Sequence, residues 1–380
     1  MVSAELADEL TQVEALKTEW DDLAIACRAP VAGPAWALAW WRYVAPAGLG
    51  LRVVAVREHR RLVGLVPLYV EPSRVVAYRL LANSYASALT PLAIPGREHE
   101  VATAAAHLLN DAEPRPDRVD LGPVPAFSPW AEAFREHWPT RMRPLSLRTR
   151  SQTVATIDIE GRTFDEWLAE RDSRMRANGR RRQRRFTELG GTYRYATAAS
   201  LRADLNRYAA LHALRWVERG QSRYLALGER LIPFFEAVAG DLIGQHRFRL
   251  LMLELGGEPI CAEISLCAGG EVASLTAGWD PRHGRLSPAR LALLYSIEEA
   301  CRLGERRIDL SWGNLEYKQE YANAVDAVVW DSLVVPSTRL VRSLPPALPA
   351  VANRRLRESL KRVLSDAQIN RVRSLRERLT

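Results

Sequence analysis

Lysine is the scarcest charged residue of this chain, which has 380 residues but only Lys17, Lys318 and Lys361. The other 50 of its 53 basic residues are arginine. A lysine ammonium is a compact point charge, whereas arginine presents a planar fork of donors, so the two are not interchangeable. Because arginine serves almost everywhere else, Lys318, in the stretch "DLSWGNLEYKQEY", is a candidate functional residue.

Several other features are missing as well. Cysteine occurs only as Cys27, Cys261, Cys267 and Cys301; none forms a CxxC, and none has histidine at zinc-finger spacing, so no metal site is expected. No apolar run reaches 18 residues, so no membrane span is expected. The N-terminal stretch "MVSAELADELTQVEALKTEW" is acidic and lacks the basic start and apolar run of a signal peptide. These absences predict a cytoplasmic protein with reduced thiols.

The residues that are present are typical of a globular protein, with 47% hydrophobic and 26% charged residues. A chain of this length is expected to form two domains. The net charge of +8 favours anionic partners, which include nucleic acids, phosphorylated metabolites and lipid surfaces. Part of this charge lies in residues 174–185, which contain seven arginines and no acid.

The C-terminal segment 336–380 differs in character from the rest of the chain. The stretch "LPPALP" reads as a linker, and the residues after it place leucines and valine on one helical face with arginines opposite. Such a basic amphipathic helix can contact an anionic membrane or a partner, or dock on the protein's own body.

Two pairs of similar segments suggest an internal duplication. "VREHRRLVGLVPL" resembles "LELGGEPICAEISL", since both read as strand, turn and strand. "DRVDLGPVP" resembles "RRIDLSWGN", with Asp120 corresponding to Asp309. Each half mixes strands with flanking helices, so we predict an α/β (α+β) fold with domains at 1–150 and 151–335.

Five stretches together resemble the GNAT-type N-acyltransferases: "RMRANGRRRQRRFTELGG", "LHALRWVERG", "EPICAEISL", "GWDPRHGRLSPARLALLYSIEEACRLG" and "IDLSWGNLEYKQEY". Their order and spacing are similar to the branch that contains the Fem peptidoglycan aminoacyltransferases and the cellulose-biosynthesis (CelD-like) and BioF2-like acetyltransferases. The resemblance covers about residues 10–335. It implies two tandem GNAT-like domains, each a mixed twisted sheet flanked by helices, with the active site in the C-terminal one.

Four residues are candidates for the chemistry of acyl transfer. Lys318 suits the stabilisation of the tetrahedral oxyanion, and the resemblance implies the same role. Tyr317 is its neighbour and is expected to line the site. Glu263 alternates with apolar residues in "CAEIS" and is a candidate base. His212 is a second candidate base, although a lone helical histidine is more often structural.

Other residues are candidates for substrate binding. Arg176 and Asn178 match the basic-x-Asn element that faces a substrate phosphate in the Fem branch, and arginine binds phosphate bidentately. Tyr85 lies in a loop that usually carries an acid in this family, but here Ala86 and Ser87 follow it. The remaining candidates are Arg215, Trp216, Trp279 and Asp280.

The donor is expected at the start of the helix that follows "GWDPRHGRLSPAR". GNAT enzymes bind the pyrophosphate of coenzyme A with backbone N–H groups at this helix N-terminus. Ser287 is the predicted N-cap and Pro288 the first helical residue. The residues assigned to the donor are Ser287, Ala289 and Arg290. The usual glycine spacing is degenerate here, so an aminoacyl-tRNA end is an alternative donor.

Three functions therefore remain open. The first is an N-acyltransferase that uses acetyl-CoA or another acyl-CoA and acts on an amine of a small molecule or cell-envelope precursor. The second is a Fem-type aminoacyltransferase that uses aminoacyl-tRNA. The third is a GNAT-like binding scaffold without activity. No DNA partner is expected.

Overall fold

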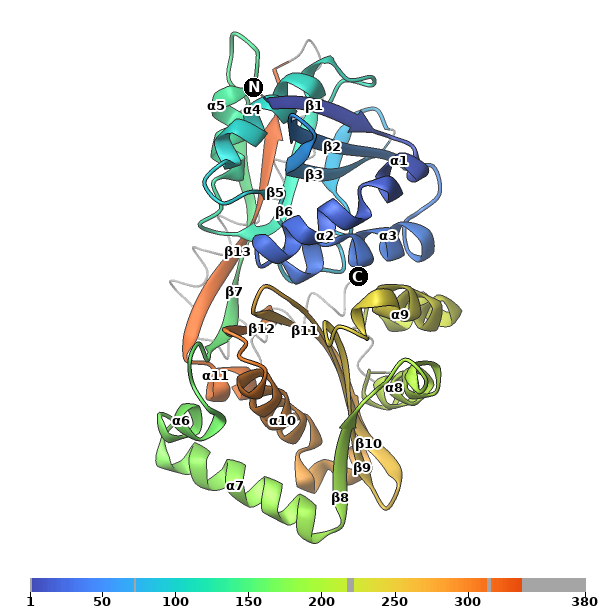
Figure 1. Ribbon diagram of the computed structural model, residues 1–380, viewed down its shortest axis with the longest axis vertical. Helices are drawn as coiled ribbons and strands as arrows, with labels where there is room; N and C mark the ends of the chain where they lie inside the picture. Colours follow the sequence, from blue (N-terminus) through green and yellow to red (C-terminus); the bar gives the residue numbers. More distant parts are fainter. Residues whose placement is uncertain (1, 72, 217–221, 313–315, 337–380) are drawn as a thin grey trace, which may run out of the picture.

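Two halves, each built from strands and helices, stack end to end in an elongated molecule (Figure 1). The computed structural model describes residues 2–71, 73–216, 222–312 and 316–336. Of the C-terminal segment 336–380 only Pro336 is described, so the predicted amphipathic helix lies outside the described residues. In the part of the chain that is described, no helix combines the length and the apolar character needed to cross a bilayer.

The strands of the two halves follow one another in a single sheet whose order is β1-β2-β3-β4-β6-β13-β7-β12-β11-β10-β9-β8, with β5 paired to β3. The N-terminal half provides β1 (Val2–Ala7), β2 (Gly50–Glu58), β3 (Arg61–Glu71), β4 (Ala77–Leu80), β5 (Leu92–Ala93) and β6 (Arg118–Pro125). The C-terminal half provides β8 (Gly191–Tyr195), β9 (Phe248–Leu255), β10 (Glu258–Ala268), β11 (Glu271–Trp279) and β12 (Arg307–Trp312).

The pairing pattern of the first half recurs in the second. Strands β1 to β4 pair antiparallel in order, and β4 then pairs parallel with β6. Strands β8 to β11 likewise pair antiparallel in order, and β11 pairs parallel with β12. The strand–turn–strand segments predicted from the sequence are β2–β3 and β9–β10. This recurrence supports the predicted tandem duplication, which stays a prediction about the origin of the chain.

Two long strands join the halves. β7 (Leu145–Asp158) pairs with β12 of the C-terminal half, and β13 (Ala324–Val334) pairs with β6 of the N-terminal half. β7 and β13 also pair with each other from Ala324↔Thr156 to Val334↔Leu145. The expected domain boundary at residue 150 falls inside β7, so the division of the chain at that residue stays a prediction.

Helices cover both faces of this sheet (Figure 1). Those of the N-terminal half are α1 (Leu10–Ala15), α2 (Lys17–Ala26), α3 (Pro34–Tyr43), α4 (Glu98–Asp111) and α5 (Trp130–His137). Those of the C-terminal half are α6 (Phe164–Ala169), α7 (Ser173–Glu188), α8 (Leu201–Trp216), α9 (Leu231–Ala239), α10 (Pro288–Arg302) and α11 (Glu316–Tyr321). Short 3₁₀ turns occur at Pro30–Ala32, Leu225–Arg230, Gly240–Leu242 and Pro281–Leu286. In the C-terminal half, α8 and α9 lie on one face and α10 on the other.

Local sequence explains where these elements begin and how closely they pack. α6 begins with a capping box between Thr163 and Glu166, and the Asp172 side chain accepts the Met175 N–H at the start of α7. Gly278 on β11 allows α8 to lie directly on the sheet, because a Cβ there would come within 2.4 Å of the His212 backbone nitrogen. This close approach fixes where the C-terminal end of α8 meets the strands.

The largest apolar core is continuous between the halves. The Trp36 ring on α3 packs edge-on against the Phe234 ring on α9, with centroids 5.1 Å apart, and both side chains are fully buried. A separate cluster lies between the sheet and α10 and includes Leu294, Ile297, Ile308 and Tyr321. The predicted α/β class, with a mixed twisted sheet flanked by helices, is confirmed.

Candidate active site

The candidate site lies where two parallel strands of the C-terminal half separate. β11 and β12 pair from Glu271↔Arg307 to Ala273↔Asp309, and their pairing ends there although both strands continue. We call the place where β11 and β12 stop pairing the strand opening. α11 reaches it, because the Lys318 side chain on α11 contacts Ser311 of β12.

Lys318 on α11 is buried at this opening, with 8% of its surface exposed. Its Nζ donates to the backbone oxygen of Ser311, at 3.2 Å. The pKa of Lys318 is lowered to about 8, mainly by burial and also by the positive charge of Arg215, while the charges of Asp309 and Glu263 oppose this shift. The rare lysine is therefore a partly desolvated cation at the strand opening and does not point into bulk water.

Asp309, at the end of the paired part of β12, is the acidic residue whose charge acts most strongly on Lys318. Its carboxylate accepts the Ser311 N–H at 2.6 Å and the Ser87 hydroxyl at 3.2 Å. Burial raises the pKa of Asp309, while those hydrogen bonds and the Lys318 charge counteract the rise. Ser87 is 3% exposed and comes from the N-terminal half, so both halves contribute to the site.

Sequence reasoning did not assign Asp309, Ser87 or Ser311 to the site. A signal was available, because Asp309 is a charged residue inside an apolar strand, and such residues are seldom buried without a partner. Its counterpart Asp120 in the first half is paired differently: it binds Arg79 at 3.2 Å, Arg118 at 2.9 Å and the Ser332 hydroxyl at 2.7 Å. At the equivalent place in the N-terminal half, the carboxylate is therefore neutralised by two arginines.

Glu263 on β10 is buried beside the same opening and is 5% exposed. Its carboxylate accepts the Ser274 hydroxyl at 3.1 Å and the Ser296 hydroxyl at 3.4 Å, which come from β11 and α10. Burial raises the pKa of Glu263 to about 7, and the two serine hydroxyls and the Lys318 charge limit the rise. A carboxyl with this pKa exchanges a proton readily near neutral pH.

Tyr317 and Arg215 complete the cluster. Burial raises the pKa of Tyr317, and the charge of Arg215 and its hydrogen bond to the phenol oppose that rise. The Arg215 guanidinium lies 5.9 Å from the centre of the Trp279 ring. Lys318, Tyr317, Glu263, Arg215 and Trp279, five of the predicted site residues, are thus brought together by four different elements.

His212 belongs to a different environment, in the contact between α8 and β11. Its Nε2 lies 2.6 Å from the Ser222 hydroxyl oxygen, and its Nδ1 lies 3.3 Å from the Ala277 carbonyl oxygen. Burial lowers the pKa of His212 to about 4. A neutral, 2% exposed imidazole with these partners has the features of a structural histidine, and its proposed role as base stays a prediction with less support than that of Glu263.

The arginine-rich helix α7 carries the predicted phosphate contacts. The Arg176 guanidinium donates to the backbone oxygens of Ala169 and Arg171 and so closes the turn between α6 and α7. The Asn178 side chain accepts from Arg181 at 3.1 Å. Neither residue has a contact with the Lys318 cluster among the interactions of the described residues, and phosphate binding by either stays a prediction.

The remaining substrate-binding candidates are dispersed. The Tyr85 hydroxyl donates to the backbone oxygen of Arg223 at 3.1 Å. Because Tyr85 belongs to the N-terminal half and Arg223 to the C-terminal half, this bond lies at the contact between the halves, as does that of Ser87. Asp280 forms an ion pair with Arg282, whose hydrogen bonds lower the pKa of this carboxyl. Trp216 ends α8, and its side chain lies outside the described part of the chain.

The predicted donor site at the start of α10 has few free donors. Ser287 is the N-cap residue, with φ of 51°, but its hydroxyl makes no cap hydrogen bond. Pro288 has no N–H, and the N–H groups of Arg290 and Leu291 already donate to the Ser287 carbonyl. Within the described residues, this leaves the Ala289 N–H for an anion. The Arg290 side chain is paired with Glu320 at 3.1 Å.

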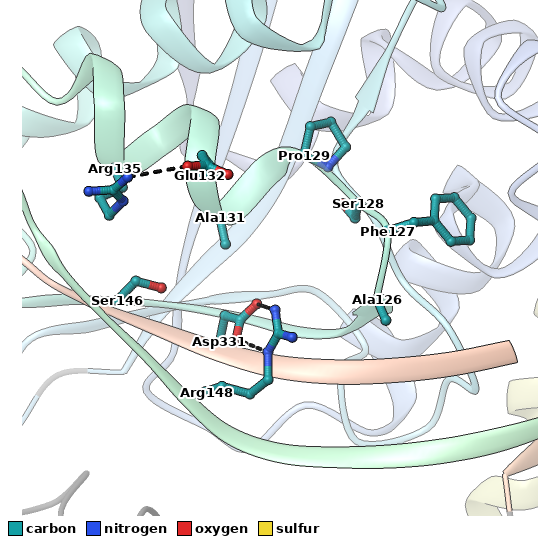
Figure 2. Close-up of a pocket in the computed structure, with 10 residues that line it drawn as sticks. All are labelled: Ala126, Phe127, Ser128, Pro129, Ala131, Glu132, Arg135, Ser146, Arg148 and Asp331. Carbon is teal, nitrogen blue, oxygen red and sulfur yellow. Dashed lines mark hydrogen bonds and ion pairs between the residues drawn. The ribbon is translucent and has the colours of Figure 1, made fainter.

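Two open cavities lie away from Lys318. One of about 490 Å³ in the N-terminal half is lined by α5 and by β7 and β13, with the Arg148–Asp331 ion pair on its floor (Figure 2). The other, of about 430 Å³, lies between α8 and the turn after β11 and includes Leu214, Asp280 and His283. Neither cavity is lined by a member of the Lys318 cluster.

Comparisons with known proteins identify one domain of the chain and its overall fold. Residues 173–319 match the family model of the acetyltransferase (GNAT) domain. No curated protein sequence matches the chain. FemX is a similar solved structure, with a TM-score of 0.61 and 11% identity over 89% of this chain and 99% of FemX.

Two further structures have the same fold at low identity. A conserved protein of unknown function from Bacteroides thetaiotaomicron has a TM-score of 0.56 and 11% identity, over 86% of this chain and 99% of that one. L-PGS from Bacillus licheniformis has a TM-score of 0.52 and 11% identity, over 88% of this chain and 95% of that one. The finer placement in the cellulose-biosynthesis or BioF2-like branch stays a prediction. Residues 173–319 are therefore identified as an acetyltransferase (GNAT) domain, and the chain as a whole has a Fem-like fold.

Proposed function

We propose that this protein is an N-acyltransferase that moves an acyl group from acyl-CoA to an amine of a small molecule or cell-envelope precursor. The observation that carries the proposal is the buried cluster at the opening between β11 and β12, where Glu263 and Lys318 have pKa values of about 7 and 8. Acyl transfer to an amine needs both a proton acceptor and a cation that stabilises the oxyanion. The cluster contains one candidate for each task.

Glu263 is the proposed proton acceptor. An amine attacks a carbonyl only after it has lost its proton, and a carboxylate with a pKa near 7 accepts that proton at neutral pH. The hydroxyls of Ser274 and Ser296 fix the carboxylate between the sheet and α10. As the new C–N bond forms and the donor's C–S bond breaks, the proton leaves the nitrogen for Glu263 and finally reaches the thiolate or solvent.

Lys318 is the proposed oxyanion partner. Its ammonium is held by the Ser311 carbonyl and lies in the electrostatic field of Asp309, so its position is fixed before the substrate arrives. A preorganised cation in a site with little water stabilises developing negative charge far more than one in bulk solvent. Asp309 and Ser87 are proposed as positioning residues. Asp309 binds the N–H of Ser311, whose carbonyl accepts from Lys318, and Ser87 binds the Asp309 carboxylate.

A second donor, aminoacyl-tRNA, is favoured by one specific observation. The first turn of α10 retains the Ala289 N–H as its free backbone donor in the described chain, which is a poor cradle for a pyrophosphate. The arginine-rich face of α7 would suit a nucleic acid backbone instead. Acyl-CoA nevertheless stays the first donor of this proposal, and aminoacyl-tRNA is the alternative that these two observations favour.

A direct comparison of the two donors tests the proposal. Release of free coenzyme A from acetyl-CoA and longer acyl-CoAs is measured with a panel of amines, in parallel with transfer from a mixture of radiolabelled aminoacyl-tRNAs to the same amines. Product formation from either donor that is lost in Lys318→Ala supports acyl transfer and identifies the donor. The matched control is Lys17→Ala, because Lys17 is a surface lysine that pairs with Asp241. Binding of a donor without turnover in any arm would instead support a binding scaffold.

A further inference from the structure

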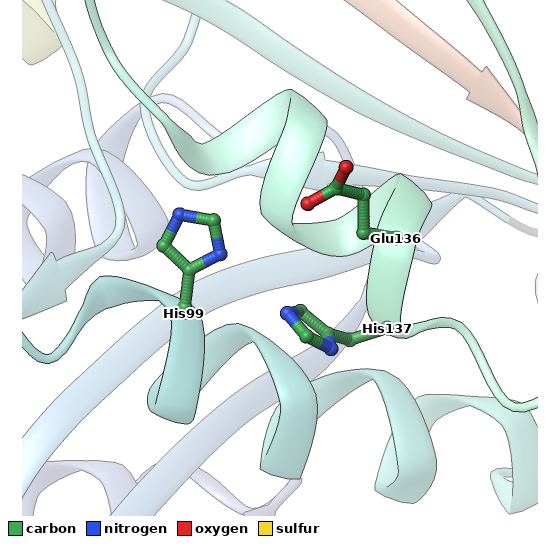
Figure 3. A group of neighbouring side chains, drawn as sticks. All are labelled: His99, Glu136 and His137. Carbon is green, nitrogen blue, oxygen red and sulfur yellow. The ribbon is translucent and has the colours of Figure 1, made fainter.

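The contact between α4 and α5, on the surface of the N-terminal half, brings three side chains together that are separate from the proposed acyl-transfer site. His99 lies in the first turn of α4, and Glu136 and His137 are the last two residues of α5 (Figure 3). One ligand atom from each of the three lies within 4.8 Å of the other two. We propose that His99, Glu136 and His137 bind a divalent transition-metal ion, with Zn²⁺ as the best-fitting cation.

The ligand chemistry supports this cation class. Two imidazoles and one carboxylate form a mixed nitrogen and oxygen set, which suits Zn²⁺ and its neighbours in the first transition series. Mg²⁺ and Ca²⁺ prefer sites made of oxygen ligands. Three protein ligands leave a fourth tetrahedral position for water or a small anion.

The geometry needs only small movements. Metal–nitrogen bonds of about 2.0–2.1 Å at a tetrahedral angle put the two nitrogens roughly 3.3 Å apart. The ligand atoms lie within 4.8 Å of one another, and the imidazole centres are 5.7 Å apart with the rings nearly perpendicular. His99 and Glu136 are exposed, so rotation of their side chains can close the remaining gap without disturbing the core.

The surrounding charges leave the carboxylate available. The Arg135 guanidinium binds Glu132 at 3.3 Å and reaches Glu136 only at 3.9 Å, so its stronger partner is Glu132. The C-terminal end of α5 favours a cation at His137, whereas the N-terminal end of α4 opposes one at His99. These two helix effects act against each other, so the ligand set itself decides the affinity.

Bound metal would link the start of α4 to the end of α5, and this link would stabilise the N-terminal half without changing the chemistry at Lys318. The spacing of the cysteines predicts no metal site. His99 and His137 are far apart in the sequence and match no ligand spacing, so only folding brings them together.

Titration of the tag-free, metal-stripped full-length protein with ZnCl₂ tests the proposal by calorimetry and by thermal unfolding. We expect one ion per chain and a rise in the unfolding midpoint, with no such effect of MgCl₂. His99→Ala and His137→Ala should each weaken Zn²⁺ binding at least roughly 10–100-fold. Loss of a group that only supports a metal ligand already has an effect of that size. The matched control is His107→Ala, an exposed histidine on the same helix outside the cluster.

A second readout separates binding from a loss of folding. Co²⁺ bound by these ligands in tetrahedral geometry gives visible absorption bands, which should be present in the wild type and in His107→Ala and absent from Glu136→Ala. Equal Zn²⁺ affinity in the wild type and in the two histidine variants would overturn the proposal. So would stoichiometric binding that leaves the unfolding midpoint unchanged and produces no visible Co²⁺ bands.

Discussion

Replacement of Lys318 by methionine is the most informative single change, because it removes the ammonium and keeps an unbranched apolar stem. Loss of one well-placed oxyanion partner typically lowers kcat by about 10²–10³-fold. Lys318 is 8% exposed and is held by the Ser311 carbonyl, so we expect a decrease of at least about a hundredfold. Lys318→Arg keeps the charge but not the shape, and should recover only part of the rate.

The pH dependence follows from the same two groups. Catalysis requires Glu263 without its proton and Lys318 with its proton, and their pKa values are about 7 and 8. The wild-type profile of kcat/KM should therefore be bell-shaped, with a narrow maximum between those values. In Lys318→Met the fall at high pH should disappear. The rise of kcat/KM on the acid side should shift to higher pH, because the Lys318 charge lowers the pKa of Glu263 in the wild type.

Lys318→Met should lower activity but not the free energy of unfolding. Burial depresses the pKa of Lys318 from 10.5 to about 8, so at neutral pH the folded state carries a charge that it disfavours. At one pKa unit per 1.36 kcal/mol this cost is on the order of 3 kcal/mol, and it disappears as pH rises from 8 to 10.5. Lys318→Met should therefore be at least as stable as the wild type at pH 7, with a smaller gain at higher pH.

The assay combines steady-state kinetics with the productive donor, from pH 6 to 9, and urea unfolding at the same pH values. Lys17→Met is the matched control, since Lys17 lies on the surface with 52% of its side chain exposed. Lys318→Arg with full activity would show that generic charge is sufficient and that the scarcity of lysine is no guide. A wild-type rate in Lys318→Met would refute the proposed role of the residue altogether.

Two further predictions concern other predicted residues. Glu263→Gln should lower kcat about a hundredfold or more. It should also raise the free energy of unfolding above pH 7 by up to about 3 kcal/mol, because the raised pKa of Glu263 makes the wild type lose stability as pH rises from 4.5 to 7. Kinetics and urea unfolding at pH 5 and 8 check both effects, and unchanged stability at pH 8 would contradict the burial argument. Arg176→Ala should raise the KM of a phosphorylated substrate relative to Arg180→Ala, an exposed arginine of the same helix; a lower unfolding midpoint with unchanged KM would assign Arg176 to the α6–α7 turn alone.

Local sequence signals were sufficient for much of the fold. The apolar runs around the polar turns predicted β2–β3 and β9–β10, and the proline after Ser287 predicted the start of α10. These predictions depend on interactions within a few residues, which one stretch of sequence contains. The scarcity of lysine likewise singled out Lys318, which is buried at the strand opening.

Long-range pairing was not encoded in any local pattern. The exchange of β7 and β13 between the halves depends on partners such as Ile308↔Ile157 and Val329↔Val124, so the duplicated segments did not reveal that residue 150 lies inside a joining strand. The contribution of Ser87 to the Asp309 carboxylate depends on a contact between residues 222 positions apart. The sequence alone thus determined which segments become strands and helices and which lysine to examine. Only the tertiary structure decided which charges are buried together, because desolvation and electrostatic pairing depend on distances in space.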